Sequence, residues 1–305
     1  MNNTIIQVQH LVISFGNFKA VDDISFEVSR GEIFGFLGAN GAGKTTTIRT
    51  LCGILNPTSG KVLVNGTDVA ASTAVLKPHI GYMSQKFTLY PDLTVLENMD
   101  IAGSLYELST YQIRKRTEEL FSFTGLSEIP AGPVSMLPGG IRQIIALTAS
   151  VLHDPEIIFL DEPTAGTSPQ TRQAFWTLIR RLSAKGKTVF VTTHYMDEAE
   201  YCSRIVLMER GHILSAGTPE NLKKKYFPQK PAELSFTKGN QQAVASEIRS
   251  LGFGSVSVFG SRLRVYIKDE KAFRDYCLEH NSGFTVRAVE PTLDDVFLKA
   301  ISGAE

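Results

Sequence analysis

The sequence predicts an α/β protein with an inserted helical segment and a small α+β unit at its C-terminal end. Three observations support this fold class. Short apolar runs typical of buried parallel strands alternate with helical patterns from residue 33 to residue 193. Residues 91–152 show helical patterns alone. Beyond a linker at 228–231, strand and helix patterns follow one another in the order βαββαβ.

Composition limits the classes of protein that this chain can belong to. Its 305 residues are enough for one large domain with a smaller appendage. Basic and acidic residues balance at 31 each, so no overall field would recruit nucleic acid or anionic lipid, and we expect no nucleic-acid partner. The three cysteines lack the spacing of a metal site and are interpreted as reduced core residues. No apolar stretch approaches a membrane span, and the first residues do not resemble a secretory signal.

The most specific motif lies at residues 38–45, which fit the pattern G-x-x-x-x-G-K-[ST]. An apolar strand at 33–37 precedes it and a helix predicted at 44–55 follows it, which is the order of a P-loop NTPase. Glycines let successive N–H groups point at phosphate oxygens, and the helix start adds a positive dipole end. Lys44 supplies a cation for the β- and γ-phosphates, and the Thr45 hydroxyl can bind Mg²⁺. The residues predicted to bind nucleotide here are Gly38, Asn40, Gly41, Ala42, Gly43, Lys44, Thr45 and Thr46.

Two carboxylates follow a second buried strand at residues 157–160. Ligands bind at the carboxyl ends of the strands in an open α/β sheet, so this position favours a functional site. Asp161 is placed to hold Mg²⁺, and Glu162, which points elsewhere, to take a proton from an attacking water. The alternative is a pair of acids that caps a loop, but the P-loop in the same chain favours the functional interpretation.

Three further candidates lie where strands end. Gln85 follows a strand at 80–83, and its amide could contact Mg²⁺ or orient a water, although most such glutamines are merely solvated. His194 follows the strand at 188–193. A lone histidine is more often a core residue, but its place at the end of a central strand favours a γ-phosphate contact. Phe15 ends a strand at 4–14, and from pattern alone it reads as a core residue rather than an adenine-stacking aromatic.

The helical subdomain is expected from about residue 87 to residue 152. A capping box of Thr94 and Glu97 opens its first helix. Beyond the subdomain, a helix carries the single tryptophan, Trp176, which we expect to be buried. The remaining helices are expected at 110–123, 141–152, 170–184 and 196–202, and the remaining strands at 23–28, 61–64, 204–209 and 212–215.

Residues 1–227 form the nucleotide-binding domain in this prediction, and residues 228–305 form a separate unit. The βαββαβ order followed by a helix suggests a small ferredoxin-like fold. This unit carries no visible catalytic cluster, so we interpret it as a regulatory or docking appendage. Its expected strands are 233–237, 255–259, 263–267 and 284–289, and its expected helices are 241–251, 270–280 and 292–301.

Taken together, these segments resemble the ATPase subunit of an ATP-binding-cassette (ABC) transporter over residues 4–225. The predicted site segments fall where this family has named motifs: Walker A at 38–45, the Q-loop at Gln85, Walker B at 157–162 and the switch histidine at His194. Phe15 falls at the family's adenine-stacking aromatic, which favours that role over a core position. Residues 137–143 read LPGGIRQ and lie where the family carries its LSGGQ signature, which distinguishes it from other P-loop proteins.

Two positions depart from the family pattern. Pro138 replaces the signature serine and removes a hydroxyl and an N–H group, whereas Gly139 and Gly140 keep their N–H groups at a helix start. The resemblance implies that these three residues contact the nucleotide of a second subunit. Ser168 replaces the aspartate usual after Walker B and bears on communication between the two sites. Neither change removes a group that binds Mg²⁺ or activates water, so the resemblance implies a working ATPase.

The resemblance also implies partners and a location. Two ABC subunits, identical or homologous, would close head to tail around two ATP molecules with Mg²⁺. Integral membrane permease subunits would bind this pair at the cytoplasmic face of the cell membrane. The segments GYMSQKFTLYPDLTVLEN, VTTHYMDEAEYC and EPTLDDVFL resemble bacterial drug- and antibiotic-export ATPases whose membrane subunits are separate chains.

Three other functions fit parts of this pattern. A soluble ABC ATPase of DNA repair would need a long coiled coil between the Walker motifs, and residues 60–135 show no such heptads. A translation-associated ABC protein usually carries two cassettes, and this chain has one. A weakly hydrolysing or non-hydrolysing regulatory subunit is mildly favoured by Pro138 and Ser168, and an ATPase assay would separate it from the main hypothesis.

Overall fold

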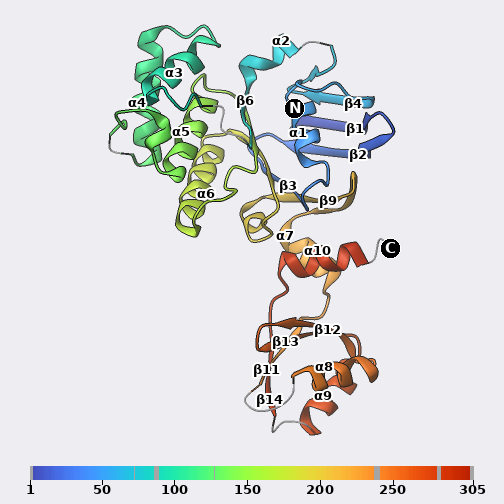
Figure 1. The fold of residues 1–305 in the computed structure, drawn as a ribbon. Helices are drawn as coiled ribbons and strands as arrows, with labels where there is room; N and C mark the ends of the chain where they lie inside the picture. The colour runs from blue at the N-terminus through green and yellow to red at the C-terminus, as the bar shows by residue number, and fades with distance from the viewer. Residues whose placement is uncertain are drawn as a thin grey trace. The chain divides into compact units, whose positions relative to one another are not determined.

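A computed structural model describes residues 3–71, 73–85, 89–126, 128–236, 241–279 and 283–302. The chain divides into two compact units, Met1–Thr218 and Pro219–Glu305 (Figure 1). Among the helices of these described ranges, none has the length and apolar character needed to cross a lipid bilayer.

A six-stranded sheet forms the centre of the N-terminal unit, in the order β10-β9-β3-β8-β7-β6. Every pair in it is parallel except the hairpin of β9 and β10. The strands β3, β7 and β8 are buried along their whole length, as their apolar runs predict. Their carboxyl ends meet at one edge of the sheet. The strands are β3 (Ile33–Gly38), β6 (Ile80–Met83), β7 (Ile157–Asp161), β8 (Thr188–Thr193), β9 (Arg204–Glu209) and β10 (His212–Gly217).

A second, antiparallel sheet has the order β2-β1-β4-β5 and shares its core with the central sheet. The strand at 23–28 was predicted too short, because a register shift between the pairs Leu11–Ile24 and Ile13–Val21 lets β2 continue past its two aspartates. The hairpin ends with Phe15 opposite Phe18. The strands are β1 (Thr4–Phe15), β2 (Phe18–Ser29), β4 (Ser59–Val64) and β5 (Thr67–Asp68).

Helix α1 (Lys44–Leu51) packs into this shared core through Ile48 and Leu51. It ends earlier than the predicted residue 55, and the prediction was wrong because it overlooked a C-terminal stop. Gly53 has φ 70°, and the N–H groups of Gly53 and Ile54 close the helix on the carbonyl oxygens of Thr50 and Arg49.

Helices α3, α4 and α5 gather on the side of the N-terminal unit away from the antiparallel sheet (Figure 1). They share a core of their own around Met99, Ile113 and Ile145. The predicted capping box of Thr94 and Glu97 is confirmed. The predicted start of this subdomain at residue 87 lies outside the described residues. The helices are α3 (Val95–Ser104), α4 (Thr110–Thr124) and α5 (Gly139–Val151).

Helix α6 (Pro169–Ala184) begins at the N-cap Ser168 and buries Trp176 completely, as expected. The acidic helix expected at 196–202 is wrong in kind and length: the segment forms only the 3₁₀ turn η3 (Glu198–Tyr201). The other short helical elements are α2 (Thr73–Leu76), η1 (Lys77–His79) and η2 (Val134–Met136).

The C-terminal unit contains a four-stranded antiparallel sheet in the order β12-β13-β11-β14, with its own apolar core. The element order βαββαβ followed by a helix is the predicted one. The unit also includes α7, which packs against α10. The predicted ends at Thr237 and His280 lie outside the described residues. The elements are α7 (Pro219–Tyr226), β11 (Ala232–Phe236), α8 (Gln241–Ser250), β12 (Gly254–Phe259), β13 (Arg262–Ile267), α9 (Glu270–Glu279), β14 (Phe284–Ala288) and α10 (Leu293–Ser302).

Candidate nucleotide-binding site

The loop between β3 and α1 depends on two glycines that no larger residue could replace. At Gly38 a Cβ atom would lie 2.2 Å from the carbonyl oxygen of Met208. At Gly43, where φ is 109°, it would lie 2.5 Å from that of Ala20. The loop therefore lies tightly against β9 and β2 and leads directly into α1. The first N–H groups of a helix have no partner within it, so a glycine loop at this position is suited to bind an anion.

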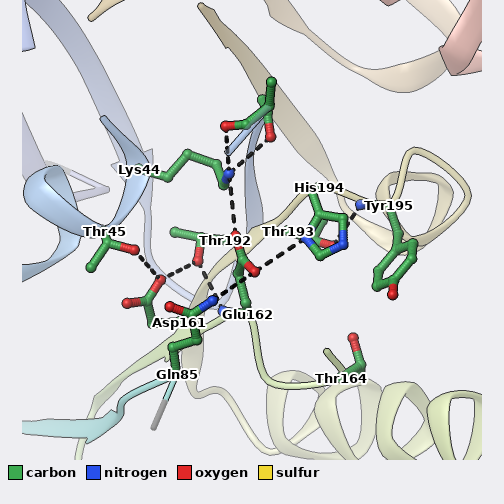
Figure 2. Close-up of polar contacts among 12 residues, drawn as sticks. Lys44, Thr45, Gln85, Asp161, Glu162, Thr164, Thr192, Thr193, His194 and Tyr195 are labelled. Carbon is green, nitrogen blue, oxygen red and sulfur yellow. Dashed lines mark hydrogen bonds and ion pairs between the residues drawn. The ribbon is translucent and has the colours of Figure 1, made fainter. Parts of the chain in front are cut away.

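Lys44 is buried, and its ammonium group points back into the loop. It donates hydrogen bonds to the carbonyl oxygens of Gly38 at 2.8 Å and Ala39 at 3.0 Å. It also lies 3.3 Å from Glu162 Oε1 (Figure 2). These contacts hold the cation within the loop that the sequence predicts to bind phosphate.

Asp161, the last residue of β7, is almost fully buried. Its Oδ1 accepts hydrogen bonds from the hydroxyls of Thr45 at 3.1 Å and Thr192 at 2.7 Å (Figure 2). Burial is the main cause that raises the pKa of this carboxyl group, and the two hydroxyls oppose the shift. Its Oδ2 is buried without a hydrogen-bond partner. A buried carboxylate oxygen left unpaired beside the Thr45 hydroxyl has the chemistry of a Mg²⁺ ligand, so these residues fit that ion.

Glu162 is the point at which the predicted catalytic residues meet. Its Oε2 accepts a hydrogen bond from Gln85 Nε2 at 3.1 Å and lies 3.1 Å from His194 Nδ1, while Oε1 faces Lys44 (Figure 2). The carboxylate is only 7% exposed. The structure thus brings together four predicted residues that come from the ends of different strands and from the P-loop.

A pocket of about 370 Å³ opens beside this cluster. Phe15 and Phe18 form part of its wall and are 53% and 65% exposed. The sequence analysis missed Phe18, although the short turn of Gly16 and Asn17 between two aromatics could have indicated a pair of rings on one hairpin. The other lining residues are Ala20, Asn40, Gly41, Gly43, Lys44, Thr45, Thr46, Gln85 and Glu162.

The signature residues lie elsewhere in the unit. Helix α5 begins at Gly139 with Pro138 as its N-cap, and both residues are exposed. Neither they nor Gly140 belong to the described lining of the pocket. Gly140 packs closely against α6, because a Cβ atom there would lie 2.7 Å from Thr171 Cγ2. The structure therefore leaves this helix start outside the pocket of its own chain.

Thr192 contacts both acidic residues of the site, and the sequence analysis missed it. Its hydroxyl donates to Asp161, and the backbone N–H of Glu162 donates to the carbonyl oxygen and to the hydroxyl of Thr192 at 3.1 and 3.0 Å. One threonine thereby holds the carboxylate of Asp161 and the backbone of Glu162. The only signal in the sequence was a pair of threonines directly before His194, which also suits an ordinary buried strand.

The glycine loop between a buried strand and a helix, with a carboxylate pair at the end of a neighbouring parallel strand, defines a P-loop nucleotide-binding protein. A family model described as ABC transporter matches residues 21–165. The Nod factor export ATP-binding protein I of Rhizobium sp. (strain N33) is 35% identical over 306 residues, which cover 100% of this chain and 99% of that protein. The chain belongs to the family of ABC transporter ATP-binding proteins.

Two further relatives show how far the likeness extends. The linearmycin resistance ATP-binding protein LnrL of Bacillus subtilis (strain 168) is 33% identical over 303 residues, covering 96% of this chain and 97% of that protein. The probable multidrug ABC transporter ATP-binding protein YbhF of Escherichia coli (strain K12) is 47% identical over 220 residues. This match covers 72% of this chain but only 38% of the length of YbhF.

Solved structures show the same fold. An ATP-binding subunit of an ABC transporter superposes with a TM-score of 0.66 at 27% identity, covering 73% of this chain and 93% of that one. A dimeric ATP-binding cassette in a post-hydrolysis state with ADP and phosphate superposes with a TM-score of 0.64 at 26% identity, covering 70% and 98%.

Proposed function

We propose that this protein is the ATP-hydrolysing subunit of an ABC exporter that works with a separate membrane permease. The observation that carries the proposal is the convergence of Lys44, Gln85 and His194 on the carboxylate of Glu162, one residue beyond Asp161. A buried carboxylate held by a cation, an amide and an imidazole, beside a P-loop, is suited to activate a water against a phosphate.

The reaction is an in-line attack of water on the γ-phosphate, with Glu162 as the general base. Lys44 and the loop N–H groups stabilise the charge that develops on the transferred phosphoryl group. His194 and Gln85 position the reactants, and the exposed ring of Phe15 stacks on the adenine. Asp161 and Thr45 would hold Mg²⁺, which when bound neutralises charge on the β- and γ-phosphates.

ATP would be enclosed between two subunits. The start of α5 is exposed and lies outside the pocket of its own chain, so the Gly139 and Gly140 amides are available to the nucleotide of a second chain. Only the closed pair would complete the phosphate shell, so ATP stabilises the dimer through contacts that the open state lacks. The dimeric structure of a similar cassette with ADP and phosphate supports this arrangement.

Substitution of the general base tests this function. Glu162→Gln keeps the shape of the side chain but removes the proton acceptor, so we expect ATP binding without turnover and accumulation of a dimer at saturating ATP. Turnover is measured by phosphate release and the dimer by light scattering. Turnover at the wild-type rate would remove Glu162 from the mechanism, and a protein that stays monomeric beside its membrane partners would overturn the ATP-enclosed dimer.

The permease, the cargo class and the location are parts of the same proposal. The names of three relatives refer to Nod factor export, linearmycin resistance and multidrug transport, which supports export of a drug, antibiotic or other small molecule. The protein would bind its permease at the cytoplasmic face of the cell membrane. Co-purification from membranes tests this, and a preparation that contains no integral membrane protein would speak against it.

A weakly hydrolysing or non-hydrolysing regulatory subunit is the second candidate. Pro138 carries no N–H group, and its side chain makes no capping hydrogen bond to α5. Absence of phosphate release from the wild-type protein, alone and with its permease, would favour this candidate over the first.

We also propose that the C-terminal unit is ferredoxin-like and serves as a regulatory or docking appendage. Two features support this: the element order βαββαβ, and a sheet in which the first and third strands, β11 and β13, lie side by side in the middle. Turnover by chains whose C-terminal core is weakened tests the regulatory part. A normal rate and normal permease binding would contradict it.

A further inference from the structure

The catalytic scheme above does not use Glu198, although this carboxylate is fully buried beside the site. Its Oε1 accepts a hydrogen bond from Thr164 Oγ1 at 2.5 Å, and its Oε2 accepts one from Thr193 Oγ1 at 2.7 Å. Arg172 Nε lies 3.4 Å from Oε1. A buried charge is costly unless it is paired, and this carboxylate is surrounded by two hydroxyl donors and one guanidinium cation that come from three separate segments.

The two threonines lie next to the catalytic residues in the chain. Thr164 belongs to the turn after β7, which the N–H of Ala165 closes on the carbonyl oxygen of Glu162 at 3.2 Å. Thr193 ends β8 directly before His194. Figure 2 shows Thr193 beside His194, and Thr164 farther along the chain from Glu162. Through these hydrogen bonds Glu198 connects the two chain segments that carry Glu162 and His194.

Arg172 extends this network to α6. It lies in the first turns of that helix, and its guanidinium group stacks 4.0 Å from the centre of the Tyr195 ring. The Tyr195 ring in turn lies 4.1 Å from that of His194. A movement of the loop between β7 and α6 would thus reach the histidine by two routes, through the carboxylate of Glu198 and through the ring of Tyr195.

We propose that Glu198 is a positioning residue, whose carboxylate fixes the separation of Glu162 and His194 and couples both to the loop before α6. This inference rests on the ATPase activity proposed above. If the carboxylate merely stabilised the core, its loss would lower the stability of the protein without a selective effect on kcat. The two possibilities therefore differ in what an isosteric substitution does to turnover.

The substitution Glu198→Gln keeps the volume but replaces one acceptor with a donor that faces hydroxyl and guanidinium donors. Because a displacement of about 1 Å of a catalytic group can cost roughly 100-fold in rate, we expect kcat to fall at least about tenfold, with KM for ATP changed less than about twofold. The matched control is Glu32→Gln. Glu32 is also buried and pairs with Arg204, but it lies at the amino end of β3, at the opposite edge of the sheet. We expect a similar loss in Tm and an unchanged kcat.

A double-mutant cycle separates positioning from general stability. If Glu198 acts through His194, then in a His194→Ala background Glu198→Gln should cost less than about twofold, whereas independent effects would multiply. An equal loss in both backgrounds, or a loss matching that of the control, overturns the proposal.

A second measurement does not depend on turnover. The imidazole NMR resonances of His194, assigned with His194→Ala, should shift in Glu198→Gln and stay in place in Glu32→Gln. Unmoved resonances in Glu198→Gln overturn the positioning role even if the wild-type protein proves inactive. That inactivity would itself be evidence against the proposed ATPase, so the two failures are distinguishable.

Discussion

Glu162 shows how much a single backbone angle contributes to the site. Its φ is 48°, in the left-handed region, and two contacts with Thr192 hold it there. The turn sends the carboxylate of Asp161 toward Thr45 and that of Glu162 toward His194. The sequence predicted both roles from their position at a strand end. It could not predict Thr192, because a threonine that orients a neighbour looks the same as one that packs in a β-strand.

The substitution Lys44→Ala tests the role of the lysine in turnover. The change removes the cation that faces the phosphates and leaves Glu162 without its ion pair. We expect turnover to fall by a factor of about 100 or more, as when one stabiliser of transition-state charge is lost. Phosphate release at saturating ATP is the measurement, and the exposed Lys61→Ala is the control. A loss of less than tenfold would contradict the assigned role of the lysine.

At the scale of elements, errors in the predicted boundaries have local causes. Helix α1 ends at a glycine stop, β2 runs through a register shift, and α5 starts at two glycines of low helix propensity. These features depend on backbone conformation rather than on hydrophobic period. The pattern of apolar residues therefore predicted that these three elements exist but not where they begin or end.

The substitution Pro138→Ser tests the start of α5. Pro138 has φ −54° and ψ 145°, a conformation that a serine N-cap also adopts. A serine side chain could cap the helix, worth about 0.5–2 kcal/mol, against about 0.4–1 kcal/mol lost because the unfolded chain becomes more flexible. We expect thermal stability to change little and hydrolysis to be unchanged or faster. Complete loss of hydrolysis would show that the proline is an adapted part of this site.

The burial of His153 predicts a pH dependence of stability. His153 stacks on Tyr106 and donates through Nε2 to the carbonyl oxygen of Ile80 at 3.0 Å. Burial, the main cause, lowers its pKa from 6.5 to about 4. The unfolded chain therefore binds this proton first, and stability that is fully present above pH 6.5 is lost as the pH falls toward 4.

Melting curves at pH 7 and pH 5 measure this effect. In His153→Phe, which can keep the ring stack, the difference in Tm between the two pH values should shrink. An undiminished difference in His153→Phe would assign the pH dependence to other groups.

For the whole molecule, the sequence predicted the architecture because parallel strands bring their carboxyl ends to one edge. That rule alone brings Gln85, Glu162 and His194 together with the P-loop from distant segments. The same rule does not predict the network of Thr164, Thr193 and Glu198. This network connects loops, and the conformation of a loop cannot be predicted from a hydrophobic period. The C-terminal unit was predicted as a separate body, and it has a core of its own.

Separate cores predict two unfolding transitions in calorimetry. Saturating ADP, at about 100 times its Kd, should stabilise the transition of the N-terminal unit alone by about 2.7 kcal/mol. Leu263→Ala, in the buried core of the C-terminal unit, should lower only the other transition, with a cost of about 2–5 kcal/mol. A single transition that responds to both changes would mean that the two units unfold together.

In the proposed mechanism, the ion pair between Lys44 and Glu162 sets the order of events. Before nucleotide arrives, the future base serves as the counter-ion of the lysine, 3.3 Å away. An incoming phosphate must displace that carboxylate from the ammonium group, and only then is the carboxylate available to accept a proton. In this scheme the carboxylate of Glu162 becomes available as a base only after the nucleotide has bound.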